Sequence, residues 1–277
     1  MPTSSIRRVK RRWTPSSSKI RLQFPCSATG FQSDERESSL RQIWYADDSA
    51  SSGSLSEIQD WWDDLNSVGP HYGYFPKASK TWLIVKPEYE QQAKEMFPDI
   101  NITQIGHKYL GSYIGTESGT KDFIQQQIEH WSKDIKDLAR IAASEPQLAY
   151  AAFVYGTSKK WLYVTRTTPN IAELLKPLEY IIQEHFIPAI VGKSFFDDDM
   201  RNVLALPARY GGLGIGNVTE LSDKEYENSL LMTSQLTSAI LLQEKCLNID
   251  KEKIEEDKKK IMCEKEAYYK NKRENML

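Results

Sequence analysis

Two adjacent carboxylates, Asp47 and Asp48, most strongly constrain how this 277-residue chain can fold. They follow the apolar residues Ile43 and Trp44 and precede a run of small residues at 49–54. This pattern around an acidic tip predicts two short strands joined by a tight turn. Such a turn would present both carboxylates at one edge of a sheet.

An acidic hairpin turn suits divalent-metal chemistry, because Mg²⁺ prefers a few carboxylates together with the phosphate oxygens of a substrate. Two such ions about 4 Å apart can activate a 3′-hydroxyl and stabilise the leaving oxygen of an in-line displacement. Other acidic runs, at 63–64 and 197–199, have no comparable context. An acidic doublet by itself is therefore weak evidence for a metal site.

Hydrophobic periodicity divides the rest of the chain into a mixed part and a helical part. Apolar residues recur at three and four positions over 55–68, and Ser54 and Gly69 supply start and stop signals, which predicts a helix. Strands are predicted at 81–85, 100–105 and 109–114, with a short helix at 87–97. After about residue 123 the pattern becomes helical. One predicted buried face consists of Ile124, Ile128, Trp131, Ile135 and Leu138.

The expected fold class is therefore α+β, with short β-hairpins packed on helices and then a mainly helical region. We expect a disordered, basic, Ser-rich leader at 1–40, a mixed domain at 41–116 and helices at 117–245. Residues 246–277 are expected to be a charged helix or tail, within a helical stretch that begins near residue 222. Its heptad positions lack a second apolar seam, which favours a solvated single helix over a coiled coil.

Composition limits the possible function classes. The net charge of -2 does not favour nucleic-acid binding, although residues 1–33 carry seven basic residues and no acidic one. Three scattered cysteines and four scattered histidines fit no zinc spacing. No apolar run reaches the length of a membrane span. We expect an intracellular protein of the nucleus or cytoplasm, with a mitochondrial presequence as the alternative role of the Arg-rich leader.

Four strings in the chain resemble segments of reverse transcriptases, in the order that this family has them. Tyr-Ala-Asp-Asp at 45–48 resembles motif C, the catalytic hairpin. Residues 73–81, which end in Lys80-Thr81, resemble motif D, although Lys77 stands where Asn is common. Residues 108–115, centred on Gly111, resemble motif E, the primer-grip hairpin. Residues 206–215 resemble a string found downstream of the polymerase in retrotransposon proteins.

The resemblance, which covers about residues 41–218, implies a palm followed by a thumb or connector region. It implies that Asp47 and Asp48 bind Mg²⁺ or Mn²⁺ and that Lys80 protonates or steadies the leaving pyrophosphate. It also implies that Tyr109, Leu110 and Gly111 approach the primer end of an RNA or DNA template–primer. The reaction of the family is template-directed nucleotidyl transfer.

Motifs A and B of reverse transcriptases have no counterpart in this sequence. Only 44 residues precede Tyr45, and their acidic residues, Asp34, Glu35 and Glu37, have no strand pattern. Two divalent ions near a triphosphate need more anionic ligands than one hairpin provides. We therefore expect a fragment that does not polymerise DNA on its own.

A non-enzymatic module derived from a retroelement, which binds nucleic acid or serves as a scaffold, is the alternative. Lys159, Lys160 and Arg166, together with Trp161 and Tyr163, could follow a phosphate backbone and stack on bases. The same pattern equally describes an amphipathic helix with Trp161 buried and the lysines in solvent.

Overall fold

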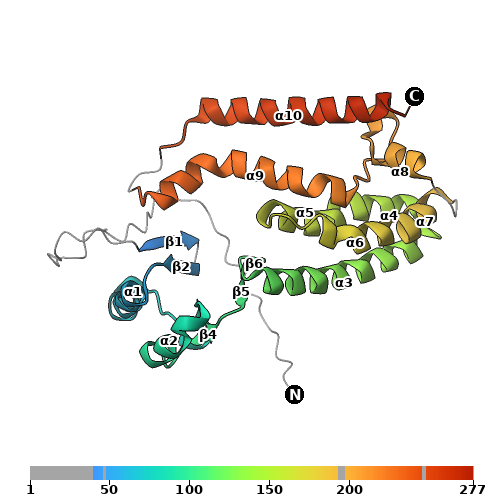
Figure 1. Cartoon of the computed structure of the whole chain (residues 1–277). Helices are drawn as coiled ribbons and strands as arrows, with labels where there is room; N and C mark the ends of the chain where they lie inside the picture. The colour runs from blue at the N-terminus through green and yellow to red at the C-terminus, as the bar shows by residue number, and fades with distance from the viewer. Residues whose placement is uncertain (1–39, 46–47, 193–196, 245–247, 277) are drawn as a thin grey trace, which may run out of the picture. The chain divides into compact units, whose positions relative to one another are not determined.

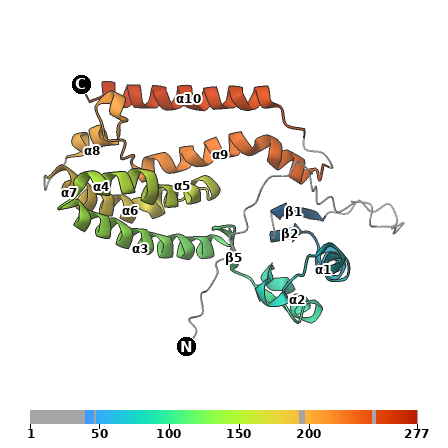
Figure 2. The same ribbon diagram turned by 180° about the vertical axis from the view of Figure 1, so that it is seen from behind.

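The structure, a computed structural model, describes residues 40–45, 48–192, 197–244 and 248–276. In this part of the chain the fold is α+β and mainly helical, as the sequence predicts (Figures 1 and 2). The expected leader, apart from Leu40, and the first carboxylate of the doublet, Asp47, lie outside the described residues. Among the described helices, none combines the length and the apolar character that a bilayer span requires.

The predicted acidic hairpin is present. Strands β1 (Arg41–Tyr45) and β2 (Asp48–Ser52) pair antiparallel, and Tyr45 lies opposite Asp48, so two residues connect them. Helix α1 (Leu55–Val68) has the predicted bounds. It begins with a capping box, in which the Ser54 side chain accepts from the Glu57 amide and the Glu57 carboxylate accepts from the Ser54 amide.

Strands β3 (Trp82–Ile84) and β4 (Asn101–Thr103) form a parallel pair, not a hairpin. The connection between them contains the 3₁₀ turn η3 (Pro87–Tyr89) and helix α2 (Glu90–Met96), since parallel strands need a crossover. Leu83, Ala93 and Phe97 are buried here, and α1 covers them with Ile58 and Trp62. This small apolar cluster joins β3 and β4 to both helices.

The segment around Gly111 is a hairpin of β5 (Gly106–Tyr109) and β6 (Ser112–Gly115), where periodicity alone predicts one strand. The described strands thus form three separate two-stranded sheets. They do not form one continuous palm sheet in the described part of the chain. Trp82 stacks on His107 with ring centroids 4.1 Å apart, which connects β3 to β5.

The largest core lies among the helices that follow. Helix α3 (Glu117–Ala142) buries the predicted face, with Leu138 only half-buried. The rings of Phe153, Trp161 and Phe186 pack together on the other side of this core. The core elements after α3 are α4 (Pro146–Ala152), the π-helical turn η4 (Phe153–Thr157), α5 (Ser158–Thr167), η5 (Glu173–Leu175), α6 (Lys176–Ile181), the π-helical turn η6 (Ile182–Phe186) and α7 (Ile187–Val191).

A buried ion pair fastens the next helices to this core. Arg201, in α8 (Asp198–Ala205), donates to the Glu179 carboxylate of α6 at 2.7 Å and to the Ile215 carbonyl at 2.8 Å. The same carboxylate accepts from the Val218 amide, 3.0 Å away, at the start of α9 (Val218–Leu241). One pair of side chains therefore fixes the position of three helices.

The glycine-rich string at 206–215 folds back onto the end of α8. The amides of Leu213 and Ile215 donate to the Leu204 carbonyl, both at 3.2 Å. At Gly212 a β-carbon would lie only 2.0 Å from the Leu206 carbonyl oxygen, so no other residue fits. The string therefore caps the helix and leads the chain to Val218.

The expected single helical stretch at the C-terminus is interrupted. Helix α9 ends at Leu241, and α10 (Lys251–Glu274) begins after Asp250, whose side chain caps it. Helix α10 has no buried residue, but it is not simply solvated, because it lies along α9 (Figures 1 and 2). Polar contacts hold it: Lys265 with Glu225, Lys272 and Tyr268 with Glu220, Glu264 with Lys224, and Glu266 with Arg209 and Tyr210.

This polar attachment predicts that salt releases α10. Raising the salt from 0.1 to 1 M shortens the Debye length from about 10 Å to about 3 Å and weakens exposed pairs. We expect faster hydrogen exchange at the amides of α10 and no change in α3, whose attachment is apolar. Equal exchange rates in α10 at both salt concentrations would contradict the electrostatic attachment.

Acid should have the same effect. Hydrogen bonds from Tyr210 and then Arg209 hold the pKa of Glu266 below its usual 4.5, and Lys224 lowers that of Glu264. A carboxyl whose pKa is lowered by folding stabilises the fold above its unfolded pKa, and this contribution is lost as the pH falls through the folded value. The protection of α10 amides, measured relative to the intrinsic exchange rate at each pH, should therefore fall below about pH 4.5, before that of α3 does.

Candidate functional site

Asp48 begins strand β2 and is exposed, and Tyr45 opposite it has 64% of its surface exposed. Tyr74, in the string at 73–81, braces this hairpin from one side. Its hydroxyl lies 3.0 Å from Ser49 Oγ, and its ring meets Trp44 edge to face with centroids 5.3 Å apart. The string that resembles motif D thus contacts the hairpin that resembles motif C.

Tyr109 belongs to the string at 108–115, which resembles motif E. Burial raises the pKa of the Tyr109 hydroxyl, and the charge of Asp48 and then the electrostatic effect of Tyr74 raise it further. The Tyr109 hydroxyl oxygen is buried and has no hydrogen-bond partner among the described residues. Tyr74 therefore contacts the hairpin that holds Asp48, and Tyr109 lies within electrostatic range of Asp48, although the sequence separates these residues by tens of positions.

Lys80 is not joined to this group by any described contact. It ends the 3₁₀ turn η2 (Ala78–Lys80), its side chain is exposed, and no ion pair or hydrogen bond links it to Asp48 within the described ranges. The backbone amide of Lys80 donates to the Lys77 carbonyl at 3.0 Å, which closes the turn. The string contacts the hairpin through Tyr74, a residue that the sequence comparison did not single out.

The turn between β5 and β6 consists of Leu110 and Gly111. Both are left-handed, with φ of +46° and +86°, as a two-residue hairpin of this twist requires. Tyr163 of α5 donates its hydroxyl proton to the Leu110 carbonyl, and its ring covers Gly111. The sequence suggests Tyr163 as a residue that could stack on bases. In the structure it instead packs against the turn of Leu110 and Gly111.

The basic candidates on α5 are already partly neutralised. Lys160 pairs with Asp134 at 2.6 Å and Arg166 with Glu225 at 2.9 Å, whereas Lys159 is exposed with no ion pair among the described residues. Trp161 is buried in the helical core. The geometry therefore favours the amphipathic-helix interpretation of this segment over a nucleic-acid surface.

The described carboxylates do not form a complete metal site. In the part of the chain with described positions, no group of three or more His, Cys, Asp and Glu side chains could hold a metal ion. Asp48 is at the expected turn, and its neighbour Asp47 lies outside the described residues. Mg²⁺ or Mn²⁺ would need further oxygen ligands beyond Asp48.

No protein-family model, no curated protein and no solved structure matches this chain. What the site can do must therefore come from its own residues. These residues are an exposed carboxylate at a hairpin turn, a buried tyrosine hydroxyl, and a second hairpin turn supported from α5.

Substitutions at the two residues of the turn, Leu110 and Gly111, should affect the free energy of unfolding differently. Gly111→Ala should lower the free energy of unfolding by about 1–2 kcal/mol, because an L-residue is strained at this φ. Its β-carbon would also come within 3.2 Å of the Tyr163 ring. Urea unfolding followed by circular dichroism measures the difference.

Leu110→Asn is the matched control for this measurement, because Asn tolerates the left-handed conformation better than Leu. It should leave the free energy of unfolding unchanged or raise it. A Gly111→Ala protein as stable as the unmodified chain would show that the turn is not held as described.

Proposed function

We propose that residues 41–218 are the C-terminal palm and the following thumb-like region of a retrotransposon reverse transcriptase. On this proposal, Asp47 and Asp48 belong to the metal-binding hairpin, and Tyr109, Leu110 and Gly111 form the primer grip. Lys80 is assigned to the leaving pyrophosphate. The partner would be an RNA or DNA template–primer, met in the nucleus or the cytoplasm.

The observation that carries the proposal is the contact between the strings that resemble motifs C and D, in which the Tyr74 hydroxyl lies 3.0 Å from Ser49 Oγ, next to Asp48. The carboxylates of motif C act on the 3′-hydroxyl of a primer, and motif E holds the same primer end. Two such elements must lie side by side to work on one nucleotide. The pKa of the Tyr109 hydroxyl is raised by burial and then by the charge of Asp48, as expected if motif E lies near motif C.

The 277-residue polypeptide by itself is proposed to be inactive as a polymerase. Its sequence has no string that resembles motif A, which supplies a further metal-binding aspartate, or motif B, which positions template and nucleotide. Loss of part of a two-metal ligand set removes the charge stabilisation on which such transfer depends. The rate should therefore fall by orders of magnitude.

Primer extension tests the inactivity directly. With Mg²⁺ or Mn²⁺, we expect no template-dependent product above that of an Asp47→Ala/Asp48→Ala double variant. Product that depends on the template, and that disappears in the double variant, would show that the polypeptide is an active polymerase.

Binding of a primer–template duplex tests the family assignment separately from activity. Lys108 is exposed on β5 beside the proposed primer grip, and Lys86 is an exposed lysine outside the four strings. Lys108→Ala should weaken binding and reduce the salt slope of the affinity by about 1, as expected for one lost phosphate contact. Lys86→Ala is the control. Equal effects of the two variants would contradict a primer grip at this hairpin.

A further inference from the structure

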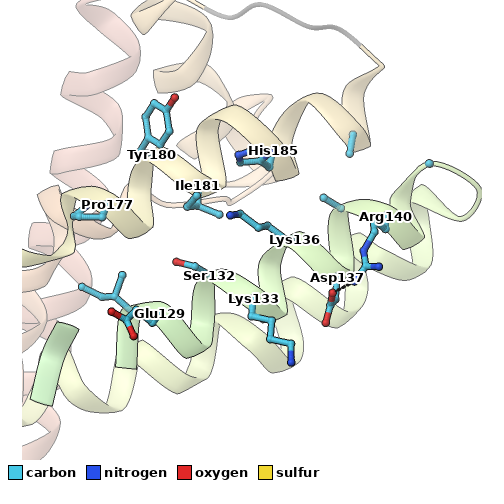
Figure 3. Close-up of a pocket in the computed structure, with 14 residues that line it drawn as sticks. Glu129, Ser132, Lys133, Lys136, Asp137, Arg140, Pro177, Tyr180, Ile181 and His185 are labelled. Carbon is cyan, nitrogen blue, oxygen red and sulfur yellow. Dashed lines mark hydrogen bonds and ion pairs between the residues drawn. The ribbon is translucent and has the colours of Figure 1, made fainter. Parts of the chain in front are cut away.

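A groove separates α3 from the broken helix formed by α6, η6 and α7 (Figure 3). Its volume is about 1180 Å³. Small residues line it: Ser132 and Ala139 of α3 and its C-cap Ala143 on one wall, and Pro177 and Ala189 on the other. The groove plays no part in the two hairpins of the proposed palm.

The floor of the groove is apolar. Ile128, Ile181 and Ala139 line it; Ile128 belongs to the helical core and Ile181 packs against that core. Along α3 the groove runs from Ile128 to Ala143, which corresponds to roughly 22 Å of helix at 1.5 Å per residue. This length matches about four turns of a second helix laid in the groove, a common mode of peptide recognition.

The rim of the groove has an excess of positive charge. Arg140 pairs with Asp137, so that these two charges offset each other. Lys133 and Lys136 are exposed and form no ion pair among the described residues, and Lys136 extends across the groove toward Ile181 (Figure 3). Glu129 is the one remaining carboxylate of the lining.

We propose that this groove binds an acidic amphipathic helix of a partner protein. Apolar side chains of the partner would contact the floor, and its carboxylates would pair with Lys136 and Lys133. The N-terminal segment of this chain does not fit, since residues 1–33 carry seven basic residues and no acidic one. Helix α10 is held on α9 by ion pairs of its own.

A single nucleic-acid strand is the less favoured occupant. Such strands bind where basic residues follow the backbone and aromatic rings stack on successive bases. Here the lining has two rings, Tyr180 and His185, both on the wall opposite α3, and the floor is aliphatic, so no row of rings follows the groove.

The test measures fluorescence anisotropy of a labelled designed helix of about 15 residues, with Leu at helical spacing and Glu elsewhere. Three further probes are a version with Leu replaced by Gln, a version with Glu replaced by Lys, and oligo-dT of similar length. We expect the full chain to bind the acidic amphipathic probe in the micromolar range and the other three much more weakly.

Lys136→Glu and Lys121→Glu locate the site, because both exposed lysines lie on α3 and Lys121 lies outside the groove. Lys136→Glu should weaken binding of the acidic probe about tenfold, by replacing an attraction with a repulsion, whereas Lys121→Glu should have little effect. The proposal is overturned if the acidic probe does not bind, if both variants weaken it equally, or if oligo-dT is the probe that depends on Lys136. Because the palm hairpins are not involved, these outcomes are independent of the primer–template results.

Discussion

The buried pair of Arg201 and Glu179 is the interaction on which the helical part of the protein depends. A charge in an apolar core is costly unless it is paired and hydrogen-bonded. Here both side chains are nearly enclosed, and they also bind the Ile215 carbonyl and the Val218 amide. Removal of one partner would leave an uncompensated buried charge, a loss of about 3–5 kcal/mol in comparable pairs. The pair therefore fixes the path of the glycine-rich string and the start of α9, along which α10 is held by salt-sensitive contacts.

Local sequence patterns predict an element correctly where the residues that determine it all lie within that element. The helix at 55–68 has its predicted bounds because Ser54, Glu57 and Gly69 are all close in the sequence. The buried face of α3 follows from its period of three and four residues. The parallel pairing of β3 and β4 could not be predicted from the sequence. Each strand is short, and the direction of pairing depends on the crossover through α2.

The candidate site could be predicted only in part. The turn that holds Asp48 follows from the residues on its two sides, but its neighbours Tyr74 and Tyr109 are brought to it by tertiary packing. Tyr163 likewise contacts the Leu110 turn across more than fifty residues of sequence. The break between α9 and α10 was missed because charged residues continue through it without a Pro or Gly to mark a stop. The burial of Arg201 could not be predicted from the sequence, because a basic residue in a polar stretch is usually exposed.

The position of the primer end on the protein tests the proposed palm most directly. A primer–template whose 3′-terminal nucleotide carries a photoreactive group can be cross-linked to the full chain, and the attached residues identified by mass spectrometry. Cross-links are expected at 45–48 and 108–111, the two hairpin turns assigned to the metal site and the primer grip. Cross-links confined to α5, or spread without preference over the surface, would contradict this assignment.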